Sequence, residues 1–366
     1  MRWDIFCRVI DNFGDVGVCW RLAADLAGRG EQVRLWLDNR RALAWLAPGG
    51  AEGVHVGVDV RDWPDGPEPT AGAEPGDVAV EAFACDPPAD FVARMRQQAP
   101  AQRPVWINLD YLTAEPWVER AHGLKSPQFS GPGQGLDKWF FHPGFSPATG
   151  GLLREPGLMA RRAAFDRDAW LAAQGWARRP DERVVVLFSY ANPALPALLK
   201  ALADAPTLLL LAQGPAQSEV AAVDPVPGQR RIALPWLSQT DFDHALWSAD
   251  LNLVRGEDSL VRAHWAGAPW VWQLYPQDDG AHAAKLQAYL AFLHGAADAD
   301  VDRSVPGIAA LFQAWNGLAP WSESATASLR GDAWRAWKAN CDERRSALLA
   351  QPDLSIQLLS FVVSKR

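Results

Sequence analysis

Short, nearly continuous apolar runs alternate with segments of helical apolar spacing along most of the chain. The first run, Trp3–Ile10, has the length of a buried strand. From Val18 to Arg29 apolar residues recur at helical spacing until Gly30, and Val33–Leu37 again looks like a strand. Strand, turn, helix and strand in this order predict the opening βαβ unit of an α/β domain with a parallel sheet.

The same alternation continues in two groups separated by a Gly- and Pro-rich region. Further buried strands are predicted at Asp77–Phe83, Pro104–Leu109, Val184–Phe188, Thr207–Leu211, Ile232–Leu234, Asp250–Arg255 and Trp270–Trp272. Helices are predicted at Pro193–Ala203, Asp241–Ser248, Leu260–Ala266, Gly331–Ala350 and Asp353–Val363, with helical spacing prevailing after residue 280.

Two segments interrupt this rhythm. Residues 62–76 are rich in Pro and Gly and predict a surface loop. Residues 126–157 predict the end of the first domain and the crossing to the second. We therefore expect two Rossmann-like doubly wound α/β domains facing a cleft. They cover residues 1–153, completed by a C-terminal helix at about 350–366, and residues 154–349. Ligands of such folds bind at the carboxyl ends of the strands.

Composition narrows the function classes. A length of 366 residues suits two domains, and 49% apolar with 21% charged residues is a globular balance. The net charge of -8 and the absence of a basic run speak against a general nucleic-acid binder.

The cysteines and the N-terminus point to the cytoplasm. Four cysteines, at positions 7, 19, 85 and 341, show no Cys-x-x-Cys spacing, so we expect reduced thiols rather than a zinc or disulfide framework. Asp4 and Arg8 interrupt the first apolar run, so we expect no signal peptide. We find no apolar run of 18 residues and expect no membrane-spanning helix.

The segment Asp11–Gly17 after the first predicted strand is the first candidate site. Asp11 and Asp15 lie four residues apart around Gly14. A single Asp here would be explained as a helix N-cap, but one cap satisfies the helix and the second carboxylate remains unexplained. Phosphate binding is disfavoured, since G-x-G-x-x-G is absent and two anions would repel a diphosphate. A site that handles protons or a cationic substrate fits better.

The segment Arg255–Ser259 between a predicted strand and helix is the second candidate site. Amides at the start of the helix, its dipole and the Ser259 hydroxyl would bind an anion, and Gly256 would allow close approach. Glu257 could accept hydrogen bonds from ribose hydroxyls or support the loop. A plain capped helix remains the alternative.

Metal-binding patterns are weak. Asp-x-Asp occurs at Asp241/Asp243, Asp298/Asp300 and Asp300/Asp302, but no pair directly follows a strongly predicted strand. We interpret these residues as helix caps and a solvated loop, and the seven histidines include no His-x-x-x-His.

Several long segments resemble a known family. Trp3–Ala23, Lys138–Glu155, Gln239–Asp243 and Arg255–Ser259 are similar to the protein-arginine rhamnosyltransferases that modify elongation factor P in bacteria. The resemblance implies an inverting glycosyltransferase of the B-type fold. It implies transfer of rhamnose from dTDP-β-L-rhamnose to one arginine of elongation factor P. Because the metal-binding patterns are weak and helix N-terminal amides could stabilise the leaving dTDP, we expect no metal ion and no other cofactor.

The resemblance also implies roles for individual residues. Asp15 would be the general base, Asp11 would orient the guanidinium group, and Glu257 would complete the catalytic set. Phe188 and Phe242 would lie on either side of the thymine. The donor-binding candidates are Asn12, Phe13, Gly14, Gly17, Phe188, Tyr190, Gln239, Phe242, Arg255, Gly256, Glu257, Asp258 and Ser259.

Elementary chemistry suits this function. A guanidinium group keeps its proton until the pH exceeds about 12, and two carboxylates can clamp its planar fork and accept a proton during attack. Two alternatives remain open. A B-type glycosyltransferase for a lipid or small molecule would need an apolar or basic membrane-facing patch, and a non-catalytic nucleotide-binding protein would not need both carboxylates.

Overall fold

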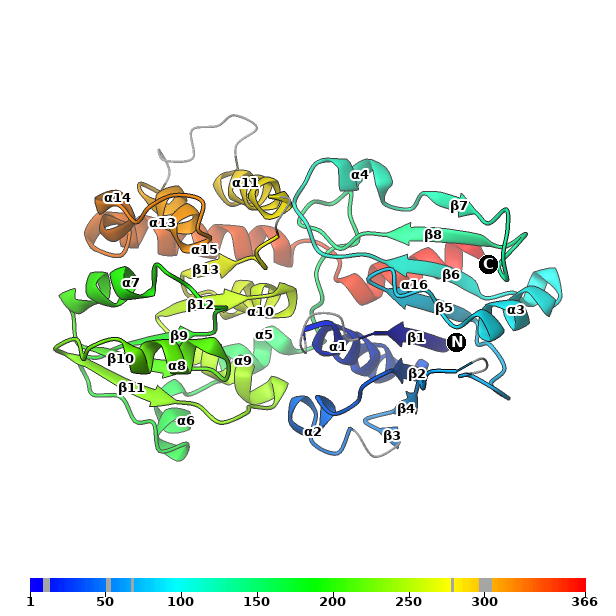
Figure 1. The fold of residues 1–366 in the computed structure, drawn as a ribbon, viewed down its shortest axis with the longest axis horizontal. Coiled ribbons are helices and arrows are strands. Elements are labelled where there is room, and N and C mark those ends of the chain that lie inside the picture. Colours follow the sequence, from blue (N-terminus) through cyan, green and yellow to red (C-terminus); the bar gives the residue numbers. More distant parts are fainter. Residues whose placement is uncertain (9–13, 51–53, 67–68, 278–279, 296–304) are drawn as a thin grey trace. The chain divides into compact units, whose positions relative to one another are not determined.

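The structure is a computed structural model that describes residues 1–8, 14–50, 54–66, 69–277, 280–295 and 305–366. The chain divides into two compact units. The first comprises Met1–Pro156 and Gln351–Arg366, and the second comprises Gly157–Ala350. Each unit contains one predominantly parallel sheet with helices packed on it (Figure 1), so the prediction of two α/β domains is confirmed.

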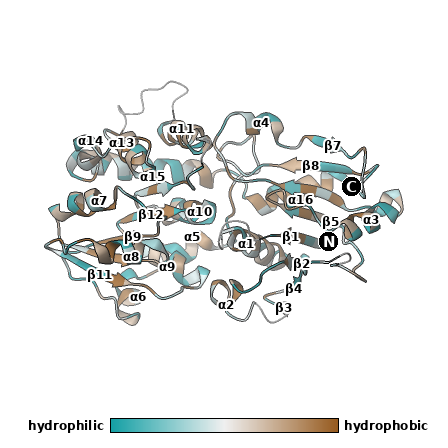
Figure 2. Cartoon of the chain, viewed as in Figure 1, coloured by the Kyte–Doolittle hydropathy of each residue, from teal (hydrophilic) through white to brown (hydrophobic). Residues whose placement is uncertain are grey.

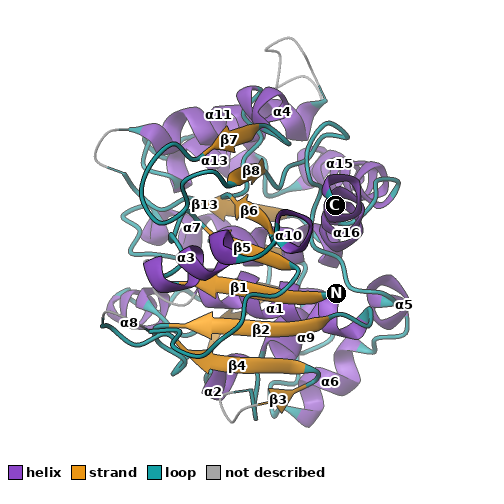
Figure 3. Ribbon diagram, turned by 90° about the vertical axis from the view of Figure 1, so that its right-hand side faces the viewer, coloured by secondary structure: helices purple, strands orange, loops and turns teal. Residues whose placement is uncertain are grey.

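The sheet of the first unit has the strand order β3-β4-β2-β1-β5-β6-β8-β7 (Figure 3). Its strands are β1 (Arg2–Cys7), β2 (Gln32–Leu37), β3 (Val54–His55), β4 (Val58–Asp62), β5 (Val78–Ala82), β6 (Val105–Leu109), β7 (Lys125–Pro127) and β8 (Asp137–Phe141). The edge strands β3 and β7 are antiparallel to their neighbours, and the other pairings are parallel. The carboxyl end of β1 therefore lies between those of β2 and β5.

Helices cover both faces of this sheet. They are α1 (Gly14–Gly28), α2 (Leu43–Leu46), α3 (Ala89–Gln97), α4 (Trp117–Ala121) and α16 (Leu354–Lys365). Apolar side chains of α1 and α16 join one buried cluster with Ile5 and Ile107, whereas α3 packs on the opposite face with Phe6 and Trp106. Figure 2 shows hydrophobic residues gathered along the central strands, as expected for strands buried on both faces.

The sheet of the second unit has the order β11-β10-β9-β12-β13, and all its pairings are parallel. The strands are β9 (Arg183–Leu187), β10 (Thr207–Leu211), β11 (Gln229–Ala233), β12 (Leu251–Arg255) and β13 (Trp270–Gln273). The helices are α5 (Leu158–Ala163), α6 (Arg167–Ala173), α7 (Leu195–Ala201), α8 (Pro215–Ala222), α9 (Gln239–Ser248), α10 (Glu257–Ala266), α11 (Ala281–His294), α13 (Ile308–Trp315), α14 (Glu323–Ala327) and α15 (Gly331–Leu349).

Residues 126–157, interpreted as the end of the first domain and the crossing to the second, contain a strand that we did not predict. Residues Asp137–Phe141 form β8, which pairs with β6 inside the first sheet. The ring of Phe361 on α16 contacts both Phe141, with centroids 5.6 Å apart, and Trp139, at 5.9 Å. The aromatic residues are therefore core of the first unit, and the many flanking Gly and Pro residues concealed the strand.

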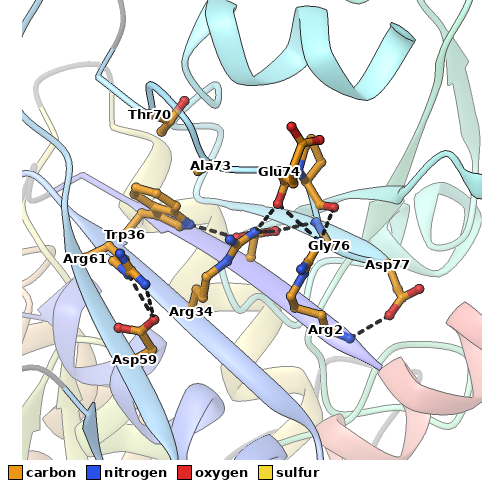
Figure 4. Close-up of polar contacts among 12 residues, drawn as sticks. Arg2, Arg34, Trp36, Asp59, Arg61, Thr70, Ala73, Glu74, Gly76 and Asp77 are labelled. Carbon is orange, nitrogen blue, oxygen red and sulfur yellow. Dashed lines mark hydrogen bonds and ion pairs between the residues drawn. The ribbon is translucent and has the colours of Figure 1, made fainter. Parts of the chain in front are cut away.

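The Pro- and Gly-rich loop before β5 is tied to the sheet (Figure 4). The fully buried carboxylate of Asp4 on β1 accepts two bonds of 2.7 Å from the Arg34 guanidinium and one of 2.8 Å from the Gly76 amide. A Cβ atom at Gly76 would lie 2.4 Å from the backbone oxygen of Arg2. Only glycine lets the loop approach the strand this closely, so this part of the predicted surface loop is anchored.

One stretch satisfies a length and hydropathy criterion for a membrane span. Gly331–Lys365 contains an 18-residue window of mean hydropathy 1.3, although we had expected no apolar run of this length. The stretch consists of two helices, and the more apolar α16 has 12 residues, fewer than the about 20 that a span requires. Its Leu354, Leu358 and Val362 are buried in the core of the first unit, which explains their apolar character.

Candidate active site

Asp15 lies in the first turn of α1, the helix that follows the central strand β1 in the chain. The helix begins at Gly14, so part of the predicted turn 11–17 is helical, and Gly17 is buried within the helix. The Asp15 side chain is buried, with 6% of the residue exposed. The positive end of the helix dipole favours a carboxylate in this position. Asp11, Asn12 and Phe13 lie outside the described residues.

The negative charge of Asp15 affects the pKa of a buried thiol at the end of β1. A hydrogen bond with Cys19, burial, and the negative charges of Asp15 and Asp38 raise the pKa of the Cys7 thiol well above its ordinary value. Cys7 is the last residue of β1 and Cys19 belongs to α1, so the Asp15 carboxylate lies close to the strand end. All four cysteines are free and buried.

In the second unit, Gly256 connects the end of β12 to the start of α10. Its φ of 72° is in the left-handed region that glycine tolerates without strain. Gly256 is the N-cap residue of α10. Because it has no side chain, it cannot accept hydrogen bonds from the amides of the first helical turn. Such amides, together with the helix dipole and the buried Ser259 hydroxyl, form the elements of an anion site.

A lysine that the sequence reasoning missed contacts this loop. The Nζ atom of Lys285 on α11 lies 2.9 Å from Oε1 of Glu257. The same ammonium group lies 5.8 Å from the centre of the Trp272 ring, and Trp272 Nε1 donates a 3.0 Å bond to the backbone oxygen of Gly256. Lys285 therefore offsets negative charge at the point where the loop would meet an anion.

Four predicted donor-binding residues cluster beside this loop. Phe188, after β9, contacts Phe242 of α9 edge to face, with centroids 5.4 Å apart and ring planes at 70°. The Arg255 guanidinium carbon lies 4.6 Å from the centre of the Phe188 ring and 4.4 Å from that of Tyr190. A base stacked between two rings needs about 7–8 Å between their planes. The Phe188 and Phe242 rings would therefore have to separate before a base could enter between them.

Gln239, another predicted donor residue, is buried in the first turn of helix α9. The hydroxyl of Ser238 accepts a bond from the Asp241 amide at 3.0 Å, so Asp241 is part of the helix cap. Asp243 was predicted to cap a helix or to lie in a solvated loop, but it is buried. It forms a buried ion pair with Arg262 of α10, at 2.9 Å and 2.6 Å. This pair joins the two helices that carry the donor candidates.

No group of three or more His, Cys, Asp or Glu side chains in the described part of the chain is arranged to hold a metal ion. Asp243 is engaged by Arg262 and is poorly placed to serve as a metal ligand. The Asp298, Asp300 and Asp302 pairs lie outside the residues that the structure describes.

Comparison with known proteins identifies the family. The model of the elongation-factor P rhamnosyltransferase family EarP matches residues 3–363. The chain belongs to this family. A protein-arginine rhamnosyltransferase of Pseudomonas putida is 43% identical to it and one of Pseudomonas aeruginosa is 41% identical, and each alignment covers 98% of both proteins. The predicted relationship to these glycosyltransferases is confirmed.

Solved structures agree with the B-type glycosyltransferase fold of the EarP family. A structure determined to explain EarP-mediated arginine glycosylation of elongation factor EF-P superposes with a TM-score of 0.64 at 30% identity, covering 100% of this chain and 99% of the other. The spinosyn rhamnosyltransferase SpnG gives a TM-score of 0.52 at 16% identity, covering 99% of both chains, and shows the fold alone.

Proposed function

We propose that this enzyme transfers rhamnose from dTDP-β-L-rhamnose to an arginine of elongation factor P, with inversion at the anomeric carbon. An arginine side-chain nitrogen forms the new bond to that carbon, the bond to the diphosphate oxygen breaks, and the guanidinium loses one proton to a carboxylate. Family membership over residues 3–363 is the observation that carries the proposal.

Asp15 is the proposed general base. Its carboxylate is buried at the start of α1, where water competes little for its hydrogen bonds and where a planar cation would be bound strongly. Asp11 is proposed to orient the guanidinium fork, a role that rests on the resemblance. Together the two carboxylates would orient one nitrogen and receive its proton as the new bond forms.

The second unit is proposed to bind the donor. The first-turn amides of α10 and the Ser259 hydroxyl would bind the diphosphate. Asp258 would complete the loop, and the Glu257 carboxylate would accept hydrogen bonds from the ribose hydroxyls. Lys285 would offset the charges of Glu257 and of the leaving diphosphate. Among the aromatic residues near Arg255, Phe188 and Phe242 would contact the thymine.

We propose that no metal ion takes part, because the first-turn amides of α10 and the Lys285 ammonium group would stabilise the leaving group. Activity should then persist in EDTA, and strong inhibition that magnesium reverses would contradict this part of the proposal. We further propose a cytoplasmic enzyme without a nucleic-acid or membrane partner, whose protein substrate is elongation factor P.

The direct test uses the full chain, dTDP-rhamnose and purified elongation factor P, followed by intact-mass measurement. Wild-type elongation factor P should gain one deoxyhexose unit. A variant with lysine in place of the target arginine is the matched control and should remain unmodified, since an ammonium group lacks the bidentate fork. Absence of transfer to the wild-type acceptor, or efficient transfer to the lysine variant, would contradict the proposal.

A further inference from the structure

A strained backbone segment follows β5 in the first unit. Phe83, Ala84 and Asp86 have φ values of 57°, 55° and 34°, although none of them is glycine. Side chains with a Cβ atom rarely adopt this region, and it persists only where the surrounding structure enforces it. Such segments concentrate at functional sites, so the position of this one is informative.

The strained segment lies between the carboxyl ends of β1 and β6. The Phe83 amide donates to the backbone oxygen of Leu109, the last residue of β6, at 2.8 Å. The Cys85 Sγ atom lies 3.1 Å from the backbone oxygen of Phe6 on β1. Phe83 also shares its buried cluster with Val16, the residue after Asp15. The segment therefore lies in the same part of the first unit as the proposed base.

Phe83, the first residue of the strained segment, contacts an aromatic residue that follows β6. The rings of Phe83 and Tyr111 are stacked, with centroids 4.5 Å apart and planes at 20°. Phe83 is buried, with 6% exposed, whereas Tyr111 is 38% exposed. The Tyr111 amide donates a 2.7 Å bond to Oδ1 of Asp110, which further restrains the backbone that follows β6. The result is a supported aromatic ring exposed at the carboxyl edge of the sheet.

A planar cation is the ligand that such a ring binds best, because the π-face is negative and a guanidinium group stacks flat on it. We propose that Tyr111, supported by Phe83, positions the substrate by stacking against the guanidinium group of the acceptor arginine. This inference rests on the proposed function of Asp15 in the same unit. It adds an aromatic contact to the carboxylates that orient the guanidinium.

The test is steady-state transfer by the full-length enzyme, with elongation factor P varied at saturating dTDP-rhamnose. Tyr111→Leu should raise the KM for elongation factor P by roughly 2- to 30-fold, the range expected for a cation–π contact from exposed to desolvated. Tyr111→Phe keeps the ring and should retain the wild-type KM. The dTDP-rhamnose KM should be unchanged in both variants.

Phe129→Leu is a matched control, since Phe129 is 83% exposed in the same unit and lies between β7 and β8, at the amino edge of the sheet. It should leave the acceptor KM unchanged. Equal behaviour of Tyr111→Leu and Tyr111→Phe would overturn the proposal, as would a Tyr111→Leu defect confined to dTDP-rhamnose. The role of Asp15 is tested separately by Asp15→Asn, so an inactive Asp15→Asn with an unaffected Tyr111→Leu would refute this inference alone.

Discussion

The buried ion pair between Asp243 and Arg262 offers the sharpest test of how the elements proposed to bind the donor are held together. Asp243 is 5% exposed and Arg262 is 1% exposed, and two bonds of 2.9 Å and 2.6 Å join the carboxylate to the guanidinium. Arg262→Met preserves much of the side-chain volume but removes the positive charge. The Asp243 carboxylate would then be buried without this partner.

Breaking one half of a buried ion pair costs about 3–5 kcal/mol. This loss is a large fraction of the about 5–15 kcal/mol that stabilises a typical domain. For a unit of this size, each kcal/mol lowers the Tm by about 2–4 °C, so Arg262→Met should lower the Tm of the second unit by roughly 6–20 °C.

The assay is thermal unfolding of the wild type, Arg262→Met, Asp243→Leu and the double variant. Because apolar residues of similar volume often replace a buried ion pair at little cost, the double variant should recover most of the stability lost in Arg262→Met. Two results would refute the reasoning. One is an unchanged Tm for Arg262→Met, and the other is additive losses in the double variant.

Three further predictions concern the second unit. Phe188→Ala and Phe242→Ala should each weaken dTDP binding by about 1–3 kcal/mol if the rings stack on thymine. If calorimetry shows an unchanged affinity for dTDP while the Tm is lowered, the two residues belong to the core instead. Lys285→Gln should weaken dTDP binding by about 1.5–3 kcal/mol while leaving thymidine binding unchanged. An equal loss of affinity for both ligands would mean that the ammonium group does not act on the diphosphate. Burial lowers the pKa of His264 to about 3, so the unfolded chain binds a proton that the folded chain excludes. The free energy of unfolding should therefore fall as the pH decreases from about 6.5 towards 3, and urea titrations should show a shallower fall for His264→Gln.

The sequence was sufficient to predict the elements that are determined by residues close together in the chain. The apolar runs of β1, β5, β9 and β12, with glycine-containing turns after β1 and β12, were sufficient to recognise two parallel α/β domains. β8 was missed because its five residues are enclosed by a Gly- and Pro-rich region. The strand pairs with β6 and packs against α16, which lies more than 200 residues away in the chain.

The site was predictable where a motif is contiguous, as in Arg255–Ser259, and not where contacts join distant residues. Nothing local marks Lys285 as the partner of Glu257, because the two residues lie 28 positions apart on different helices. The strained backbone at Phe83 was equally hidden. Its sequence contains no glycine to signal a positive φ, and tertiary contacts enforce the conformation.

Asp15→Asn tests the central claim most directly, because the amide preserves the shape of the side chain and removes the proton acceptor. Transfer to elongation factor P should be followed by intact mass, and dTDP-rhamnose binding should be measured by calorimetry on the same preparation. The account predicts that transfer is abolished and that donor affinity is nearly unchanged. Transfer at a rate close to that of the wild type would contradict it.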